Sequence, residues 1–219
     1  MGLALVSLKA PALFLNHDSF SKYFSPLIFS LVRDIDLIYA NVIFPAGKPA
    51  IGGPWSLVDL SGNLVTNVSF QGKWLLLYFG FARCPDICPS EMMKLARVID
   101  QLKVTHPQLA SKLVPVFVSV DPARDSLSNL KEYAKDFHPD YVFLTGSPTQ
   151  VQEMAKKYRV YVSKAEETDD GDYLVDHSIV VYFHDDKGEL SDCFTQSMRP
   201  KDISEKIVEK MTTPRGLVA

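Results

Sequence analysis

Hydrophobic and polar positions follow a regular pattern in the later part of the chain. From Gly52 onward, short continuous apolar runs alternate with runs in which apolar residues recur at helical spacing. The clearest apolar run is Trp74–Gly80, which is typical of a central strand buried on both faces. Leu113–Val120 is a second run of this kind. Between them, Glu91–Val104 places its apolar residues on one side of a helix.

Turn residues predict a hairpin near each end of this part of the chain. The strands of the first hairpin are Trp55–Leu60 and Leu64–Phe70, and those of the second are Ile179–Phe183 and Leu190–Phe194. Three more helices are expected: one from Asp125, as the N-cap, to residue 137, one over 147–158 with a capping box, and one over 200–211. This order of strands and helices indicates a three-layer α/β plan.

Residues 1–48 differ from the rest and are interpreted as a separate, atypical segment. They contain 4 basic and 3 acidic residues, and their longest uncharged run, Leu37–Gly47, has 11 residues. A membrane-spanning helix needs about 20 apolar residues, so none is predicted there. A targeting sequence, the remnant of an anchor and a disordered segment are the alternatives. Residues 49–212 are expected to form the folded domain, and residues 213–219 a flexible tail.

Composition is that of an ordinary globular protein. Hydrophobic residues make up 47% of the chain and charged residues 22%, which excludes a disordered or collagen-like chain. The net charge of −3 and the scattered basic residues give no reason to expect a nucleic-acid partner. One acidic cluster is interpreted as a solvated loop, with a docking surface for a partner as the alternative; it consists of Glu166, Glu167, Asp169, Asp170 and Asp172.

Three cysteines are too few for a secreted fold held together by disulfides, so each is considered for its chemistry. Cys84 and Cys88 lie four residues apart, between the predicted Trp74–Gly80 strand and the following helix. The amides and the positive dipole of a helix N-terminus lower thiol pKa, and Arg83 should act in the same direction. Cys193 is interpreted as a half-buried strand residue, with a spare redox thiol as the alternative.

The spacing of the cysteine pair favours a shared metal ion and leaves a disulfide open. In a regular helix, Cβ atoms four residues apart are separated by about 5–6 Å, whereas a disulfide needs about 3.5–4.5 Å. Two thiolates can share one metal ion with their sulfurs about 4 Å apart. Pro85 and Pro89 can deform the first helical turn and so permit a disulfide. Asp86 would raise thiol pKa but favour a bound cation, and these two effects oppose each other.

A third metal ligand is expected from the five histidines. His177 directly precedes the predicted Ile179–Phe183 strand, and in a thioredoxin-like sheet the loop before that strand faces the cysteine loop. Asp121 and Asp176 are candidate acceptors that would orient the imidazole ring, an inference from residue type alone. The other four histidines are interpreted as surface residues: His17, His106, His138 and His184.

Several motifs in a fixed order make the chain similar to the Sco family (synthesis of cytochrome c oxidase). The first runs from Gly72-Lys73-Trp74 through the apolar strand to Cys84-Pro85-Asp86-Ile87-Cys88-Pro89. The second is Ser119-Val120-Asp121-Pro122-Ala123-Arg124-Asp125, and the third is Val175-Asp176-His177-Ser178. The resemblance covers the chain from about Gly52 to Met211. Ala82-Arg83 departs from the polar residue and histidine that many members carry before the first cysteine, a difference that can change thiol acidity.

The resemblance implies a three-layer thioredoxin-like α/β fold with a central mixed sheet and an N-terminal hairpin. It also implies that Cys84, Cys88 and His177 bind copper, and such a ligand set suits copper(I) although zinc could also fit. Family members help to build the dinuclear copper centre of cytochrome c oxidase subunit II, so that subunit and a copper-donor protein are the implied partners. They are usually tethered to the mitochondrial inner membrane, facing the intermembrane space, or to a bacterial membrane, facing the periplasm.

Copper delivery competes with a redox function for the same two sulfurs. As a metallochaperone, the chain would hold copper and pass it by ligand exchange to thiolates on its partner. As an enzyme, it would be a thiol-disulfide oxidoreductase that cycles Cys84 and Cys88 and acts on the cysteines of subunit II. His177 would matter much less for the second function than for the first.

Overall fold

A computed structural model describes residues 51–164, 173 and 175–213 of the chain. The atypical segment 1–48 with His17, the acidic cluster and residues 214–219 of the predicted tail lie outside the described residues, so the domain boundaries stay predictions. Within the described residues, no helix combines the length and the apolar character needed to cross a membrane.

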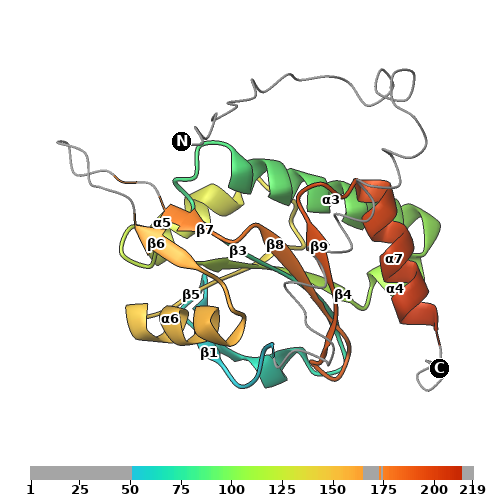
Figure 1. Cartoon of the computed structure of the whole chain (residues 1–219), viewed down its shortest axis with the longest axis horizontal. Coiled ribbons are helices and arrows are strands. Elements are labelled where there is room, and N and C mark those ends of the chain that lie inside the picture. Colours follow the sequence, from blue (N-terminus) through green and yellow to red (C-terminus); the bar gives the residue numbers. More distant parts are fainter. Residues whose placement is uncertain (1–50, 165–172, 174, 214–219) are drawn as a thin grey trace, which may run out of the picture. The chain divides into compact units, whose positions relative to one another are not determined.

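Seven strands form one mixed sheet in the order β2-β1-β5-β4-β3-β8-β9 (Figure 1). Strand β3 is parallel to β4, and β4 is parallel to β5, whereas the outer pairs are antiparallel. The strands are β1 (Ser56–Asp59), β2 (Leu64–Thr66), β3 (Trp74–Gly80), β4 (Leu113–Ser119), β5 (Val142–Thr145), β8 (Val180–His184) and β9 (Leu190–Thr195). Two further strands, β6 (Val162–Lys164) and β7 (Val175–His177), pair antiparallel in a small separate sheet.

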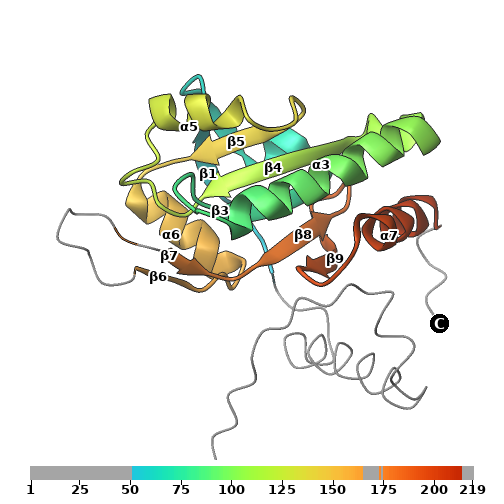
Figure 2. The same ribbon diagram turned by 90° about the horizontal axis from the view of Figure 1, so that it is seen from above.

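Helices cover both faces of the seven-stranded sheet. Helices α3 and α7 lie side by side on one face, and α6 lies on the other (Figures 1 and 2). Helix α5 joins α3, because Tyr133 of α5 packs on Phe117 of β4 and its hydroxyl contacts Met92 of α3. The helices are α3 (Ile87–Thr105), α4 (Pro107–Ala110), α5 (Leu127–Ala134), α6 (Pro148–Lys157) and α7 (Pro200–Thr212). The predicted three-layer α/β architecture with a mixed sheet and an N-terminal hairpin is confirmed.

Strand β3 is an interior strand, between β4 and β8, and all seven of its residues are buried, as expected for a strand covered on both faces. Successive side chains point to opposite layers. Tyr78 reaches towards α3, where its hydroxyl contacts the Cys88 sulfur, whereas Phe79 packs against Tyr158 and Tyr182 beside α6. Aromatic pairs of this kind contribute about 0.5–1.5 kcal/mol each beyond simple area burial. The strand therefore fixes both layers and carries the cysteine loop at its end.

Two predicted boundaries near the functional residues are wrong. Helix α3 begins at Ile87, four residues before the expected start, because Pro89 falls in the first turn, where its missing N–H costs nothing. Helix α5 begins at Leu127 with Ser126 as its N-cap: the Ser126 hydroxyl accepts the amide N–H of Asn129 at 3.2 Å. The expected cap, Asp125, instead points into the protein.

The first hairpin is also shorter than predicted. Strand β2 ends at Thr66, and Asn67–Phe70 forms a 3-10 turn. The cause is local, since the Ser69 hydroxyl accepts the Thr66 amide N–H at 3.0 Å and so turns the chain. The capping box that predicts α6 is confirmed, with Ser147 and Gln150 bonding each other's amides.

Candidate metal centre

The loop between β3 and α3 places the Cys84 sulfur at the N-terminus of the helix. The amide N–H of Cys84 bonds the Phe81 carbonyl at 3.2 Å and so tightens the loop directly after the strand. Asp86 occupies the N-cap position of α3, but its side chain makes no capping hydrogen bond. The Cys84 sulfur accepts the amide N–H of Cys88 at 3.3 Å instead. A sulfur thus does the work of an N-cap oxygen.

This position separates the acidities of the two thiols. A hydrogen bond from the Cys88 thiol, together with the amides of Cys88, Asp86 and Ile87, lowers the pKa of Cys84 to about 5 against the opposing effect of burial. The same thiol–thiolate hydrogen bond, together with burial, raises the pKa of Cys88. The predicted acidification by the helix N-terminus is therefore confirmed for Cys84 and wrong for Cys88. The largest cause is the neighbouring thiol and not the charge of Arg83.

His177 meets the cysteine pair from β7. Its Nε2 lies 3.3 Å from the Cys88 sulfur, and both residues are buried. Its Nδ1 lies 3.1 Å from the carbonyl oxygen of Ser178. Because a carbonyl only accepts hydrogen bonds, Nδ1 carries the proton of the neutral ring and the Nε2 lone pair faces the sulfur. Histidines that bind metals usually have this arrangement, with the second nitrogen donating to a carbonyl or carboxylate.

The donor set fits a soft metal ion. With metal–sulfur and metal–nitrogen bonds of about 2.3 and 2.0–2.1 Å, a sulfur and an imidazole nitrogen on one three-coordinate ion are separated by about 3.8 Å. Cys88 and His177 lie 3.3 Å apart, so a small outward shift of the two side chains would admit the ion. Among the residues that the structure describes, no three His, Cys, Asp or Glu side chains are already set around a common point. A three-ligand site therefore requires the Cys84 sulfur, which already bonds the Cys88 amide, to move closer to His177.

Aromatic rings enclose the histidine. The Phe81 ring packs edge-on to the His177 imidazole, with centroids 5.8 Å apart, and Tyr78 does the same at 6.2 Å. The Tyr78 hydroxyl also donates to the Cys88 sulfur at 3.5 Å. Cys88 and His177 are thus buried among aromatic rings, whereas Cys84 is partly exposed.

The aspartates expected to orient His177 do not do so. Asp176 is exposed on the opposite side of β7. Both carboxylate oxygens of Asp121 are engaged elsewhere, by the Tyr173 hydroxyl at 2.7 Å and by Arg124 Nε at 2.5 Å. The Ser178 carbonyl takes the orienting role, and a backbone group leaves no signal in the pattern of side chains.

His184 is not the surface residue that its place beside a turn predicts. It is the last residue of β8, pairs with Leu75 of β3 and is 1% exposed. Nδ1 bonds the Gly188 carbonyl at 3.1 Å, and Nε2 has no hydrogen-bond partner among the described residues. Burial lowers the pKa of His184, against smaller opposing effects of the Gly188 carbonyl and of Asp185. Sequence reasoning missed it because β8 extends one residue beyond the predicted strand.

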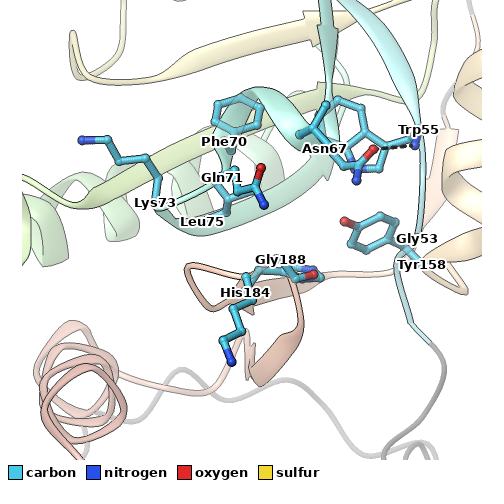
Figure 3. A pocket seen from close by; sticks show the side chains of 12 residues that line it. Gly53, Trp55, Asn67, Phe70, Gln71, Lys73, Leu75, Tyr158, His184 and Gly188 are labelled. Atoms are coloured by element: carbon cyan, nitrogen blue, oxygen red, sulfur yellow. Dashed lines mark hydrogen bonds between the residues drawn. The ribbon is translucent and has the colours of Figure 1, made fainter.

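His184 lines a pocket of about 100 Å³ near the start of β3, at the other end of that strand from Cys84 (Figure 3). The rings of Trp55, Phe70 and Tyr158 line the same pocket. The Lys73 amine points away from it and donates to a backbone carbonyl of residue 111. No described residue that lines the pocket is a cysteine, an aspartate or a glutamate. Among the described residues, His184 is therefore the one side chain of a usual metal-binding type that lines this pocket.

The remaining candidates stay apart from the cysteine pair. His106 is exposed at the end of α3, as predicted, and His138 is half-buried, with Nε2 3.2 Å from an Asp100 oxygen. Cys193 is half-buried on β9 opposite Tyr182, which confirms its interpretation as a strand residue. Burial raises the pKa of Cys193 to about 12.

Comparison with known proteins shows which family the chain belongs to. The SCO1/SenC family model matches residues 45–212. "Protein SCO1 homolog 1, mitochondrial" of Arabidopsis thaliana is 54% identical over 137 residues, which are 63% of this chain and 40% of the relative. "Protein SCO1, mitochondrial" of Saccharomyces cerevisiae is 44% identical, over 74% of this chain and 55% of the relative. The chain thus spans about half the length of the curated relatives that it matches.

Solved structures show the same fold. The copper-bound structure of Arabidopsis thaliana ScoI is 44% identical in sequence with a TM-score of 0.69, over 74% of this chain and 98% of that one. Copper-bound yeast Sco1 is 42% identical with a TM-score of 0.71, over 77% of this chain and 92% of that one. The predicted thioredoxin-like fold is confirmed. On the family match and these likenesses together, the chain belongs to the SCO1/SenC family.

Proposed function

We propose that this protein is a copper metallochaperone and that Cys84, Cys88 and His177 hold the copper ion as cargo. The observation that carries the proposal is the 3.3 Å contact between the Cys88 sulfur and the His177 Nε2 lone pair, with the Cys84 sulfur bound to the Cys88 amide beside it. Two thiolates and an imidazole prefer copper(I) to hard, oxygen-binding cations. The relatives whose structures hold copper support the same conclusion.

The three residues would contribute in different ways. Cys84 is already a thiolate at neutral pH and is partly exposed, so it would meet an arriving ion first. Cys88 would lose its proton on binding, and His177 would offer the lone pair of Nε2, since Nδ1 bonds the Ser178 carbonyl. An exposed sulfur beside a buried pair suits ligand exchange, because a thiolate of the partner can replace Cys84 while the buried ligands still hold the ion.

The acceptor in this proposal is the dinuclear copper site of cytochrome c oxidase subunit II, and a separate copper-donor protein loads the chain. The family, named for the synthesis of cytochrome c oxidase, supports this role. The proposed location is the mitochondrial inner membrane, with the folded domain in the intermembrane space. Relatives named as mitochondrial proteins support that compartment.

Titration of the reduced protein with copper(I) tests the proposal. We expect one tightly bound equivalent, and a large loss of affinity in Cys84→Ser, Cys88→Ser and His177→Ala. His106→Ala is the matched control, since His106 is exposed at the far end of α3. Unchanged stoichiometry and affinity in all three site variants would refute the proposal.

A thiol-disulfide oxidoreductase is the second candidate, favoured by the partly exposed thiolate of Cys84. In that reaction Cys84 attacks a partner disulfide, and Cys88 then displaces the partner's sulfur as a disulfide forms between Cys84 and Cys88. Two electrons pass to the partner, whose cysteines leave reduced. An assay with an oxidised two-cysteine peptide separates the functions: His177→Ala would retain reductase activity and Cys84→Ser would lose it. Equal loss in both variants argues against simple redox chemistry.

A further inference from the structure

His177 lies on a short strand, β7, that has little stability of its own. Strand β7 has three residues and pairs with the three residues of β6, outside the seven-stranded sheet. A two-stranded piece of this length is at best marginally stable in water. Just past the pair, Ser178 adds two bonds, its amide to the Tyr161 carbonyl at 3.3 Å and its hydroxyl to the Tyr161 amide at 3.1 Å. Contacts with neighbouring elements must therefore fix His177.

Arg124 supplies such contacts, through Tyr173. Its Nη1 donates to the Tyr173 carbonyl at 2.6 Å, and its guanidinium carbon lies 3.5 Å from the centre of the Tyr173 ring. Asp121 closes the arrangement, since one carboxylate oxygen accepts Arg124 Nε and the other accepts the Tyr173 hydroxyl. The Arg124 and Asp121 side chains are only 10% and 6% exposed, so these bonds are little weakened by water. Tyr173 precedes His177 by four residues.

Asp125, the residue after Arg124, bonds the loop that contains Cys84. It is 1% exposed, and its Oδ2 accepts the Ala82 amide at 3.0 Å and the Ser119 hydroxyl at 2.7 Å. Ala82 precedes Cys84 by two residues. The Asp125 carboxylate thus links the cysteine loop to the end of β4, and the Ala82 amide that it accepts lies 43 residues before it in the chain.

Arg124 and Asp125 belong to the same turn. The amides of Arg124 and Asp125 both bond the Asp121 carbonyl, at 3.2 and 2.9 Å. Arg124 also lies 5.9 Å from the centre of the Phe81 ring, which packs against His177. The turn over residues 121–125 therefore contacts the cysteine loop directly, and it also contacts Tyr173, which lies just before β7.

We propose that Arg124 and Asp125 are positioning residues: Arg124 sets the place of His177, and Asp125 sets the place of the cysteine loop. What the assembled site then does rests on the proposed copper function, whereas the positioning itself does not. Lysine cannot replace Arg124, because it lacks the planar fork that bonds a carboxylate and a carbonyl while stacking on a ring. Asparagine can replace Asp125, because its single oxygen can accept both donors.

Amide hydrogen exchange of the reduced, metal-free protein tests the positioning directly. The reporters are two hydrogen-bonded amides, Ser178 beside His177 and Cys84 in the cysteine loop. Arg124→Leu should speed exchange at Ser178 at least tenfold and leave Cys84 within threefold, and Asp125→Ala should do the reverse. Asp125→Asn should restore protection of Cys84. Arg199→Leu, which removes an exposed ion pair at the start of α7, is the control and should change neither reporter.

Uniform acceleration across the sheet, or no change at either reporter, would overturn the proposal. If Arg124→Leu does not fold, Arg124→Lys replaces it in the test. We expect Arg124→Lys to speed amide exchange at Ser178 by a smaller factor and to leave exchange at Cys84 unchanged. Because no metal is added, this experiment decides the positioning even if the copper function fails.

Copper(I) affinity supplies the second readout, as a double-mutant cycle with His177→Ala. Loss of a residue that orients a metal ligand costs about 10–100-fold in affinity. Arg124→Leu should show a loss in that range in the native background and less than twofold in the His177→Ala background. An equal loss in both backgrounds would mean that Arg124 does not act through His177.

Discussion

The two buried histidines make an instructive comparison, because they share their burial and their tautomer but not their surroundings. His177 and His184 each end a strand, and each places Nδ1 3.1 Å from a backbone carbonyl. In both neutral rings the Nε2 lone pair is therefore available. The Nε2 of His177 faces the Cys88 sulfur at 3.3 Å, whereas the Nε2 of His184 meets no hydrogen-bonding atom in the part of the chain that the structure describes.

The difference shows that a correctly oriented imidazole does not by itself make a metal ligand. Around His177, the end of β3 and the start of α3 bring two sulfurs to the ring. Around His184, the pocket is lined by aromatic, aliphatic and amide side chains and by the lysines Lys73 and Lys187. What distinguishes the two ends of β3 is the cysteine loop.

The largest effect expected from this comparison is on copper(I) affinity. His177→Ala removes a ligand, so it should cost at least the ~100-fold that loss of a residue orienting a ligand can bring. His184→Leu, which keeps the volume of the buried side chain, should change the affinity less than twofold. Competition with a chromophoric copper(I) chelator under reducing conditions measures both. Similar losses in the two variants would remove the distinction between the histidines.

Thiol reactivity should separate the cysteine loop from the rest of the sheet. Cys84, with its pKa lowered to about 5, should be alkylated by iodoacetamide with a midpoint near pH 5. Cys193, with its pKa raised to about 12, should stay unmodified at neutral pH and serves as the internal control. Cys88→Ala removes the thiol that donates to Cys84 and should move the midpoint upward. Peptide mass spectrometry over a pH series gives the midpoints, and an unmoved midpoint would contradict the assigned hydrogen bond.

Gly80, beside Cys88, and Gly188, beside His184, allow the two ends of β3 to be compared by protein stability. A Cβ on Gly80 would lie 2.8 Å from the Phe117 ring and 3.1 Å from the Cys88 sulfur, so Gly80→Ala should lower the free energy of unfolding by about 1–3 kcal/mol. A Cβ on Gly188 would meet nothing within 4 Å, but its φ of +81° costs an alanine about 1 kcal/mol. Urea unfolding measures both. We expect Gly80→Ala alone to weaken copper binding, and equal binding by the two variants would be evidence against a steric link to Cys88.

The smallest effect concerns the pH dependence of stability. Burial lowers the pKa of His184 below its ordinary value of 6.5, so below about pH 6.5 the unfolded chain takes up a proton that the folded protein does not. The stability contributed by neutral His184 is therefore present above that pH and lost as the pH falls. Unfolding free energies at pH 7.5 and 5.5 should fall more steeply in the native protein than in His184→Leu. Groups shared by both proteins, including the buried Asp125, cancel in that difference, and parallel curves would contradict it.

The sequence predicts elements well where the chemistry is local. The bounds of β3 are predicted in full, because a continuous apolar run of seven residues has one favourable environment. The start of α6 follows from a serine, a proline and a glutamine that satisfy the first turn among themselves. The sequence does not predict β5, β6 and β7 as strands, because three or four residues carry too little pattern and each strand depends on pairing with another strand.

The candidate site divides in the same way. The cysteine pair follows from its spacing, and His177 from its place before a strand. The acidity of each thiol depends on which sulfur receives the hydrogen bond, and that direction is set only by the folded loop. The burial of Asp125 depends on a contact with Ala82, and nothing near Asp125 in the sequence distinguishes it from a helix cap.

The contact between Cys88 and His177 also has a consequence for the order in which the protein is made. The two residues are 89 positions apart, so at a synthesis rate of about 5–20 residues per second the thiols precede the imidazole by roughly 4–18 s. Strands β3 and β4 and helix α3 can pair while β7 does not yet exist, because their contacts are closer in sequence. The nascent chain therefore presents paired thiols without their histidine, and for that interval its sulfurs depend on the reducing power of their surroundings.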